Sequence, residues 1–378
     1  MNKVGEDRGM SVPSSLSTLS VSAAPAVAWP EHGGPDAAGP VRFDFSTNAN
    51  PLPAPEELWQ VLRQVNRCCY PEPSYRALRA CLGAWSGVGA ERIVPTAGSS
   101  EAIRRLSLAA HLQGWREVWV PEPGYADYRV AAQMLGLRVH AWRTPEQLMA
   151  GLRSHPGPAL VWITEPASPT GGTLPPELWP LLLARAHAGG AHVVLDRAYE
   201  PLRLYGHDPV PPDVAQQCWQ MLSPNKALGL TGIRAGWLVV PEHLPMLMGE
   251  QVRALAPSWV LSAEGVGLLQ TWCEPSLQQW LSECRTTLRQ WRQAQRDQLA
   301  QLGWMQEDED SVTPFWLARP MEAVLDWTER QAQLRQASIK LRDARSFGLP
   351  GWVRISTQSP TTVAALRDAW RAAARPSA

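Results

Sequence analysis

Short apolar runs alternate with segments of helix length through the middle of this chain, and this alternation limits the folds that the chain can adopt. The runs cover residues 118–120, 137–139, 159–163, 192–195 and 236–240. Segments long enough for helices, such as residues 127–135 and 177–188, lie between most of them. The pattern predicts an α/β fold in which helices sandwich a mostly parallel sheet, with ligands at the carboxyl ends of the strands.

Four residues that suit a ligand site follow shortly after three of these runs. They are Tyr125, Ser168, Asp196 and Tyr199. Because α/β folds bind ligands outside the carboxyl ends of their strands, this coincidence of position predicts that the four side chains meet at one edge of the sheet.

The chain before and after this region has a different character. Residues 1–28 are rich in Ser, Ala and Val, and Ser, Thr and Pro interrupt any apolar core of a signal peptide, which predicts a disordered tail. We expect an N-terminal arm over residues 29–60, a large cofactor-binding domain over 61–250, and connecting helices with a smaller α+β domain over 251–378. Expected elements are helices over residues 55–65, 75–85, 263–302 and 361–373, with a break or kink at Pro275, and strands over 315–317, 339–342 and 352–356.

Charge and cysteine content argue against several function classes. The 378 residues contain 35 Lys and Arg against 35 Asp and Glu, so the basic excess typical of nucleic-acid or membrane-surface proteins is missing. No run approaches the ~18 apolar residues of a membrane-spanning helix. The six cysteines show no CxxC spacing and no pairing with histidine, which predicts reduced thiols in a cytoplasmic protein and no metal site.

A lysine in the glycine-punctuated segment 222–237 carries the sharpest chemical signal. Ser223 lies three residues before Lys226, and Arg234 lies eight residues after it. A lysine amine can form a Schiff base with a carbonyl group, while serine and arginine are natural partners of a phosphate. Pyridoxal 5'-phosphate presents an aldehyde and a phosphate together, so the segment predicts a site for this cofactor. The alternative is an ordinary surface lysine in a turn.

Gly98, Ser99 and Ser100 form a second candidate phosphate contact. They stand between a strand end at residues 93–96 and the start of a helix, where free backbone amides and hydroxyls can hold an anion. An ordinary serine N-cap, with Glu101 in the first helical turn, explains the same residues.

The remaining candidates supply what this cofactor's chemistry needs. A buried carboxylate keeps the pyridine nitrogen protonated, and Asp196 suits that role. Tyr199 could donate to the 3'-oxygen of the ring, and Tyr125 could stack on the ring face. Arg354 could clamp a substrate carboxylate, with Arg342 as a second cation. Each also has a plain structural explanation, as a helix cap, a core residue or a solvated charge.

These motifs, in this order, resemble those of fold-type-I pyridoxal-phosphate aminotransferases of class I and II, over nearly all of the chain after about residue 30. The motifs are Gly98-Ser99-Ser100, Pro123-Gly124-Tyr125, Ser168-Pro169-Thr170-Gly171, Asp196-Arg197-Ala198-Tyr199, Ser223-Pro224-Asn225-Lys226 and Arg354. The resemblance implies a homodimer with sites at the subunit interface, and a small-molecule substrate.

Within that family, the N-terminal part is similar to L-threonine-O-3-phosphate decarboxylases of cobalamin biosynthesis. His32-Gly33-Gly34 and the segment 44–52 carry this likeness, together with Pro257-Ser258-Trp259 and the two late arginines. Histidinol-phosphate aminotransferases share the Asn-Pro turn but usually lack the His-Gly-Gly.

The resemblance to the decarboxylases implies individual roles in the site. Arg354 would hold the substrate carboxylate, Arg342 and His32 would meet the substrate phosphate, and Tyr70 would reach the cofactor phosphate of a dimer partner. Asn48, before a proline-rich turn, either forms the turn or lines the mouth of the pocket.

Three positions depart from the family pattern. Ser168 replaces the usual asparagine that bonds the ring 3'-oxygen, Arg197 replaces a common acidic residue, and Pro314 replaces a frequent asparagine. Three functions therefore stay open: decarboxylation of L-threonine O-3-phosphate to (R)-1-aminopropan-2-yl phosphate, transamination like that of the histidinol-phosphate aminotransferases, and cofactor binding with weak catalysis.

Overall fold

The computed structural model describes residues 32–243, 246–307, 310–321 and 327–373. Contacts divide the chain into two units, residues 1–31 and 32–378, and all described residues belong to the second. The disordered tail predicted for residues 1–28 lies outside the described residues, and the predicted domain boundaries stay predictions.

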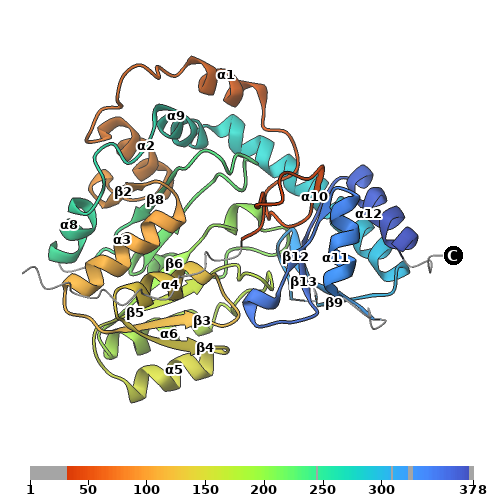
Figure 1. Cartoon of the computed structure of the whole chain (residues 1–378). Helices are drawn as coiled ribbons and strands as arrows, with labels where there is room; N and C mark the ends of the chain where they lie inside the picture. The colour runs from red at the N-terminus through yellow and green to blue at the C-terminus, as the bar shows by residue number, and fades with distance from the viewer. Residues whose placement is uncertain (1–31, 244–245, 308–309, 322–326, 374–378) are drawn as a thin grey trace, which may run out of the picture. The chain divides into compact units, whose positions relative to one another are not determined.

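A seven-stranded sheet forms the centre of the described unit (Figure 1). Its strands follow the order β2-β8-β7-β6-β5-β3-β4, and all neighbours are parallel except β8, which runs antiparallel to β2 and β7. The mostly parallel sheet predicted from the apolar runs is confirmed, but the short strand β7 was not predicted. The strands are β2 (Ile93–Thr96), β3 (Glu117–Pro121), β4 (Arg138–Trp142), β5 (Ala159–Thr164), β6 (Ala191–Asp196), β7 (Trp219–Leu222) and β8 (Gly236–Val239).

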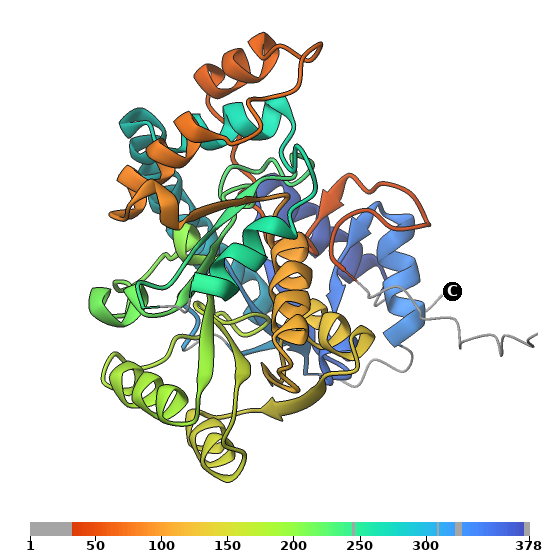
Figure 2. The ribbon, with the colours of Figure 1, turned by 90° about the vertical axis from the view of Figure 1, so that its left-hand side faces the viewer.

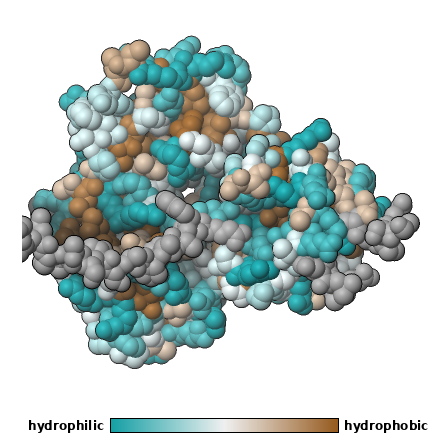
Figure 3. Space-filling view, in the orientation of Figure 1, coloured by the Kyte–Doolittle hydropathy of each residue, from teal (hydrophilic) through white to brown (hydrophobic). Residues whose placement is uncertain are grey.

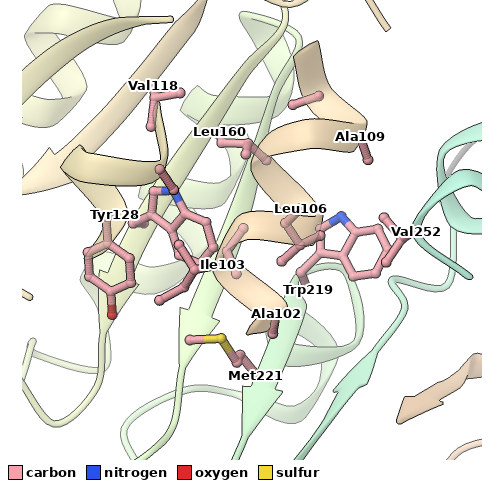
Figure 4. Packing of buried hydrophobic residues seen from close by; sticks show 14 of the residues in the cluster. Ala102, Ile103, Leu106, Ala109, Val118, Tyr128, Leu160, Trp219, Met221 and Val252 are labelled. Carbon is pink, nitrogen blue, oxygen red and sulfur yellow. The ribbon is translucent and has the colours of Figure 1, made fainter. Parts of the chain in front are cut away.

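Helices bury both faces of this sheet, as the pattern predicts. On one face, side chains of α3, α4 and α8 pack with Leu160, Val194 and Met221 of the strands (Figure 4). On the other face, α5, α6 and α7 cover residues such as Val161 and Val193. These helices are α3 (Ser99–Leu112), α4 (Ala126–Met134), α5 (Pro145–Ser154), α6 (Leu178–Ala188), α7 (Pro212–Gln216) and α8 (Met246–Ala254).

A third group of helices packs beside β2 and β8 and then leads to the C-terminal region (Figure 2). It comprises α1 (Glu56–Gln64), α2 (Arg76–Ser86), α9 (Ala263–Trp272) and α10 (Pro275–Gln301). Pro275 occupies the first turn of α10, where its missing N–H costs no helical bond. The predicted interruption of the long helical region is therefore a boundary between two helices.

The C-terminal region has its own four-stranded antiparallel sheet, in the order β12-β13-β10-β9. The predicted strand at residues 339–342 is two short strands, of which β11 pairs with β1 near the N-terminus and β12 joins the new sheet. The elements are β1 (Phe43–Asp44), β9 (Trp304–Glu307), β10 (Phe315–Pro320), α11 (Trp327–Gln336), β11 (Ile339–Lys340), β12 (Arg342–Asp343), β13 (Val353–Ser356) and α12 (Pro360–Ala373).

The described ranges also contain three single-turn 3-10 helices: η1 (Ala90–Arg92), η2 (Glu200–Leu202) and η3 (Arg345–Phe347). On the face drawn in Figure 3, hydrophilic and hydrophobic residues are interspersed. Among the described helices, none combines the length and the apolar character needed to cross a membrane.

Candidate active site

Lys226 and Tyr199 meet at the carboxyl edge of the sheet, as predicted. The Lys226 Nζ donates to the Tyr199 hydroxyl at 2.8 Å and lies 4.1 Å from the centroid of the tyrosine ring. The Asn48 amide approaches the same hydroxyl at 3.5 Å. Burial alone would raise the pKa of Tyr199, but the charges of Lys226 and Arg354 outweigh it and lower that pKa. The Tyr199 hydroxyl can therefore form hydrogen bonds with a neighbouring oxygen or amine.

The loop that carries the lysine is held by the N-terminal segment. The Asn50 N–H donates to the carbonyl of Lys226 at 2.8 Å, and its side chain donates to the carbonyl of Ala227 at 3.1 Å. Gly229 has a φ of 68°, and a Cβ there would lie 2.8 Å from the Asn50 carbonyl oxygen. Only glycine fits this close approach without strain. Asn50 therefore fixes the loop that presents the lysine.

Asp196, the last residue of β6, is a buried acid at the same edge and only 3% exposed. It accepts a 2.5 Å hydrogen bond from the Tyr128 hydroxyl and one of 3.0 Å from the Ala198 N–H. Within the described ranges no cation forms an ion pair with it. Burial raises its pKa, although the Tyr128 bond and the charge of Lys226 act in the opposite direction. A protonated ring nitrogen would supply the missing positive partner.

Tyr128 is a site residue that the sequence prediction missed. Its hydroxyl bridges Asp196 and Thr164, at 2.5 Å and 2.9 Å. It lies three residues after Tyr125, and residues three apart share one face of a helix. That spacing at the start of α4 is the signal that could have found it.

The start of α3, which the sequence predicts as a phosphate cradle, differs in one respect from the alternative of an ordinary serine N-cap. Gly98, and not a serine, is the N-cap of α3; it has a φ of 89° and no side chain to cap the helix. Ser99 is the first helical residue, so the simple serine N-cap is wrong. The first amides of a helix lack intrahelical partners and favour an anion.

Arg234 lies beside the start of α3, and Ser223 bonds the residue after this arginine. A Cβ on Gly98 would lie 2.5 Å from the Arg234 Nη2, so the guanidinium reaches the glycine backbone. The Ser223 hydroxyl is 3.0 Å from the carbonyl of Ala235, next to that arginine. The single proton of the Ser223 hydroxyl goes to the Ala235 carbonyl or to the Asn225 Oδ1, so the amides at the start of α3 and the Arg234 guanidinium are the donors that suit a phosphate group.

Tyr125 connects this cradle to an acid that was not predicted. Its hydroxyl donates to the Asp127 Oδ2 at 3.0 Å and lies 2.9 Å from the Ser100 Oγ. Because the phenol proton goes to the carboxylate, Ser100 must be the donor of the second bond. The Ser100 hydroxyl is therefore committed to Tyr125, and its backbone N–H is the group left for a phosphate.

Arg342 and Arg354 stand directly opposite each other on β12 and β13. Both are largely buried. Arg354 donates to the Ser168 hydroxyl at 3.2 Å and to the Ser46 carbonyl at 3.0 Å, and its buried Nε has no partner among the described residues. Burial lowers the pKa of Arg354. Like charges opposite each other in a sheet are unfavourable, so this arrangement suits an anion.

His32 and Tyr70 complete the predicted set, with different outcomes. The His32 Nε2 lies 3.8 Å from the Asp127 Oδ1, and the imidazole ring is 5.8 Å from the Tyr125 ring. The structure therefore brings His32 to the site. Tyr70 is 75% exposed and stacks on Trp259, with ring centroids 4.2 Å apart. It contributes no described contact to the site of its own chain.

Each of the three residues that depart from the family pattern makes a contact of its own. Ser168 touches Arg354, as above, and Arg197 forms an ion pair with Asp208. The carbonyl of Pro314 accepts a bond from the Thr357 N–H at 2.6 Å.

Solved structures of several enzymes share this fold. A histidinol-phosphate aminotransferase from Clostridium acetobutylicum superposes with a TM-score of 0.74 at 18% identity, covering 87% of this chain and 98% of the other. An L-threonine-O-3-phosphate decarboxylase from Porphyromonas gingivalis gives 0.72 at 22% identity, with the same coverage. The fold is that of the fold-type-I pyridoxal-phosphate aminotransferases.

Sequence comparison names the family. Residues 41–372 match the family model described as aminotransferase class I and II, and the chain belongs to this family. A histidinol-phosphate aminotransferase of Burkholderia pseudomallei is 33% identical over 54% of this chain, which spans 59% of that relative's length. One from Halorubrum lacusprofundi is 28% identical over 83% of this chain and 84% of its own length.

Members of this family are enzymes that use pyridoxal 5'-phosphate. The residues present fit that cofactor. The uncapped start of α3 beside Arg234 suits its phosphate, the buried Asp196 suits its ring nitrogen, and Lys226 could bind its aldehyde.

Proposed function

We propose that this enzyme decarboxylates L-threonine O-3-phosphate to (R)-1-aminopropan-2-yl phosphate, a step of cobalamin biosynthesis. The opposed pair of Arg342 and Arg354 carries the proposal. This substrate has two anionic groups, a carboxylate and a phosphate, and the site offers two buried guanidiniums with His32 nearby. The likeness in fold to a threonine-phosphate decarboxylase supports it.

Arg354 is the better candidate for the carboxylate. Its guanidinium is tied to Ser168, which belongs to the loop after β5, and its charge acts on Tyr199 beside the lysine. Arg342 donates to the Ser346 hydroxyl at 2.7 Å and would meet the phosphate with His32. A guanidinium presents a fixed fork of donors that matches either anion.

The cofactor, when bound, supplies an electron sink for the charge left after a bond at the substrate α-carbon breaks. Asp196 would hold the ring nitrogen protonated, and Tyr128 would keep that carboxylate in place. Tyr199 and Asn48 would bond the ring 3'-oxygen, and Tyr125 would cover the ring face. Gly98, Ser99, Ser100, Ser223 and Arg234 would hold the phosphate, with Tyr70 of a partner subunit.

Lys226 would have two roles, as the amine that binds the aldehyde and as the proton carrier at the α-carbon. In decarboxylation the carboxylate would leave the α-carbon as carbon dioxide, and the Lys226 Nζ would donate the proton that replaces it. In transamination the same amine removes the α-hydrogen.

Incubation with L-threonine O-3-phosphate, with and without 2-oxoglutarate, tests the proposal. We expect carbon dioxide release that needs no oxo acid, and little reaction with L-threonine, which lacks the phosphate. A covalently bound cofactor with no turnover of either kind would point to a weakly catalytic relative instead.

Transamination is the second candidate, because the sequence relatives are histidinol-phosphate aminotransferases. Its amino donor also carries a phosphate, which Arg342 could hold, while Arg354 could hold the carboxylate of the oxo acid. Glutamate formation from 2-oxoglutarate and histidinol phosphate, without carbon dioxide release, would favour this function over decarboxylation.

A homodimer with shared sites is the assembly that we propose. The exposed stack of Tyr70 and Trp259 supports it, because exposed aromatic pairs are typical of interfaces. Mixing the inactive variants Tyr70→Phe and Lys226→Ala should restore part of the activity, since a hybrid dimer would contain one intact site. Light scattering that shows only monomers would overturn this assembly.

A further inference from the structure

Asp127 is an acid that the proposed reaction does not use. It is the second residue of α4, and its side chain is 4% exposed. Besides the bond from Tyr125, its carboxylate lies 3.5 Å from the Arg104 Nη1 and 3.8 Å from the His32 Nε2. It therefore links the cradle at the start of α3 to the N-terminal histidine.

A carboxylate at this place has an electrostatic cost that calls for a reason. The site must receive a cofactor phosphate and an anionic substrate, and a buried negative charge repels both. The first turn of α4, the Tyr125 hydroxyl and two cations offset part of that cost. The buried charge of Asp127 is therefore best explained by the side chains that it contacts.

The charge of Asp127 acts on the pKa of His32 as well as on that of Tyr125. The imidazole is about half exposed, and burial lowers its pKa. Arg342, Lys226 and Arg354 lower the pKa further, while Asp127 raises it. Arg104, which contacts the same carboxylate, is a further cation in this neighbourhood. The net result is a lowered His32 pKa, and Asp127 is the acid that opposes this shift.

We propose that Asp127 is a positioning residue that orients His32 and supports its protonation when the distal phosphate of the substrate binds. The inference rests on the proposed function, since it needs a substrate that carries a phosphate. With Nε2 facing Asp127, Nδ1 is the nitrogen left to donate to the phosphate. The same carboxylate fixes Tyr125 through its hydroxyl, so one acid orients a ring of the cofactor pocket and a ring of the substrate pocket.

The test uses the Asp127→Asn variant in the cofactor-loaded protein, with nitrogen-15 NMR of the histidine rings. The pKa of His32, assigned with His32→Gln, should fall by about one unit. Binding of inorganic phosphate, measured by calorimetry, should weaken about tenfold. Glu146→Gln is the matched control, because it removes an exposed acid from the first turn of α5. It should change neither quantity.

A double variant decides whether Asp127 acts through His32. If it does, Asp127→Asn should add little to the loss of phosphate affinity already caused by His32→Gln. Fully additive losses, an unchanged His32 pKa, or tighter phosphate binding in Asp127→Asn would each overturn the proposal. These readouts need no turnover, so they separate its failure from that of the decarboxylase function.

Kinetics then separate positioning from catalysis. With L-threonine O-3-phosphate, Asp127→Asn should raise KM about tenfold and leave kcat within about twofold. A loss confined to histidinol phosphate, with inorganic phosphate binding unchanged, would instead mean that Asp127 receives the substrate's imidazole, which contradicts the proposal.

Discussion

The lysine region, formed by Asp196, Tyr199 and Lys226, and the arginine region, formed by Arg342 and Arg354, differ in how their polar groups are satisfied. In the lysine region the amine, the phenol and the carboxylate each have a close partner within the chain. In the arginine region Arg342 and Arg354 are opposite each other in register, Arg342 donates to the Ser346 hydroxyl, and the buried Nε of Arg354 has no described partner. The first arrangement is preorganised for the cofactor shared by the family, while the second keeps binding capacity for a substrate.

Their frameworks differ in the same way. The lysine region lies at the carboxyl ends of parallel strands, where connecting loops bring together residues distant in sequence. The arginine region lies on a short antiparallel ladder, where register alone sets two side chains opposite each other. We therefore expect changes in the lysine region to remove all chemistry, and changes in the arginine region to alter substrate choice.

Loss of the lysine should have the largest effect. Lys226→Ala should lose covalent attachment of the cofactor and reduce kcat at least about 1,000-fold, because the amine both binds the aldehyde and carries the proton. Borohydride reduction followed by mass spectrometry should find the modified peptide, which contains Lys226, in the wild type only. A variant that keeps a covalent yellow chromophore would contradict this role.

Loss of one arginine should sharpen the contrast. Arg354→Ala should lower kcat/KM for the phosphorylated amino acid about 100-fold while cofactor binding stays near that of the wild type, since a buried charge partner is worth about 2–5 kcal/mol. Arg345→Ala removes an exposed arginine from the neighbouring η3 helix and should change little. Equal losses of cofactor and substrate affinity in Arg354→Ala would break the division between the two regions.

Tyr128→Phe tests the support of the buried acid. A hydrogen bond to a charged group contributes about 1.5–3 kcal/mol, so the dissociation constant of the cofactor should rise at least about tenfold. Burial already raises the pKa of Asp196 and the Tyr128 bond opposes that shift, so the variant should raise this pKa further. Cofactor binding needs the ionised acid, and its loss on acidification should therefore begin at a higher pH. Spectrophotometric titration from pH 5 to pH 8 would show whether the curve moves that way.

Two glycines give the smallest and most controlled comparison. Gly98→Ala and Gly114→Ala both place a side chain at positive φ, at 89° and 81°, so each should lose about 1 kcal/mol or more of unfolding free energy. Only at Gly98 would the new Cβ also displace Arg234. Thermal melts should therefore shift in both variants, whereas weaker cofactor binding should appear only in Gly98→Ala. Equal cofactor affinities in the two variants would mean that Arg234 does not bind the cofactor phosphate.

Much of this framework could be predicted from the sequence because its signals are local. The apolar runs gave β3, β5 and β6, and their ends placed Asp196 and Tyr199 near Lys226. Strand β7 escaped notice because its four residues lead directly into the lysine segment. A serine N-cap of α3 stayed open as an alternative, because composition cannot show that Gly98 adopts positive φ there.

The contacts that were missed depend on chain segments far apart. Tyr128 reaches an acid 68 residues later, and its role exists only once α4 packs against the sheet. The proposed role of Asp127 depends on its contact with His32, a residue far away in the sequence. The register of β12 and β13 places Arg342 opposite Arg354. The sequence alone shows only that both arginines lie in or near late strands.

The bond from the Asn50 N–H to the carbonyl of Lys226 means that the N-terminal segment of the described residues supports the loop that carries the lysine. A protease cut between residues 42 and 50 would leave the central sheet covalently intact and still release the reactive amine from its support. Preparations of this enzyme should therefore lose activity on cleavage in this segment well before they lose their circular dichroism signal.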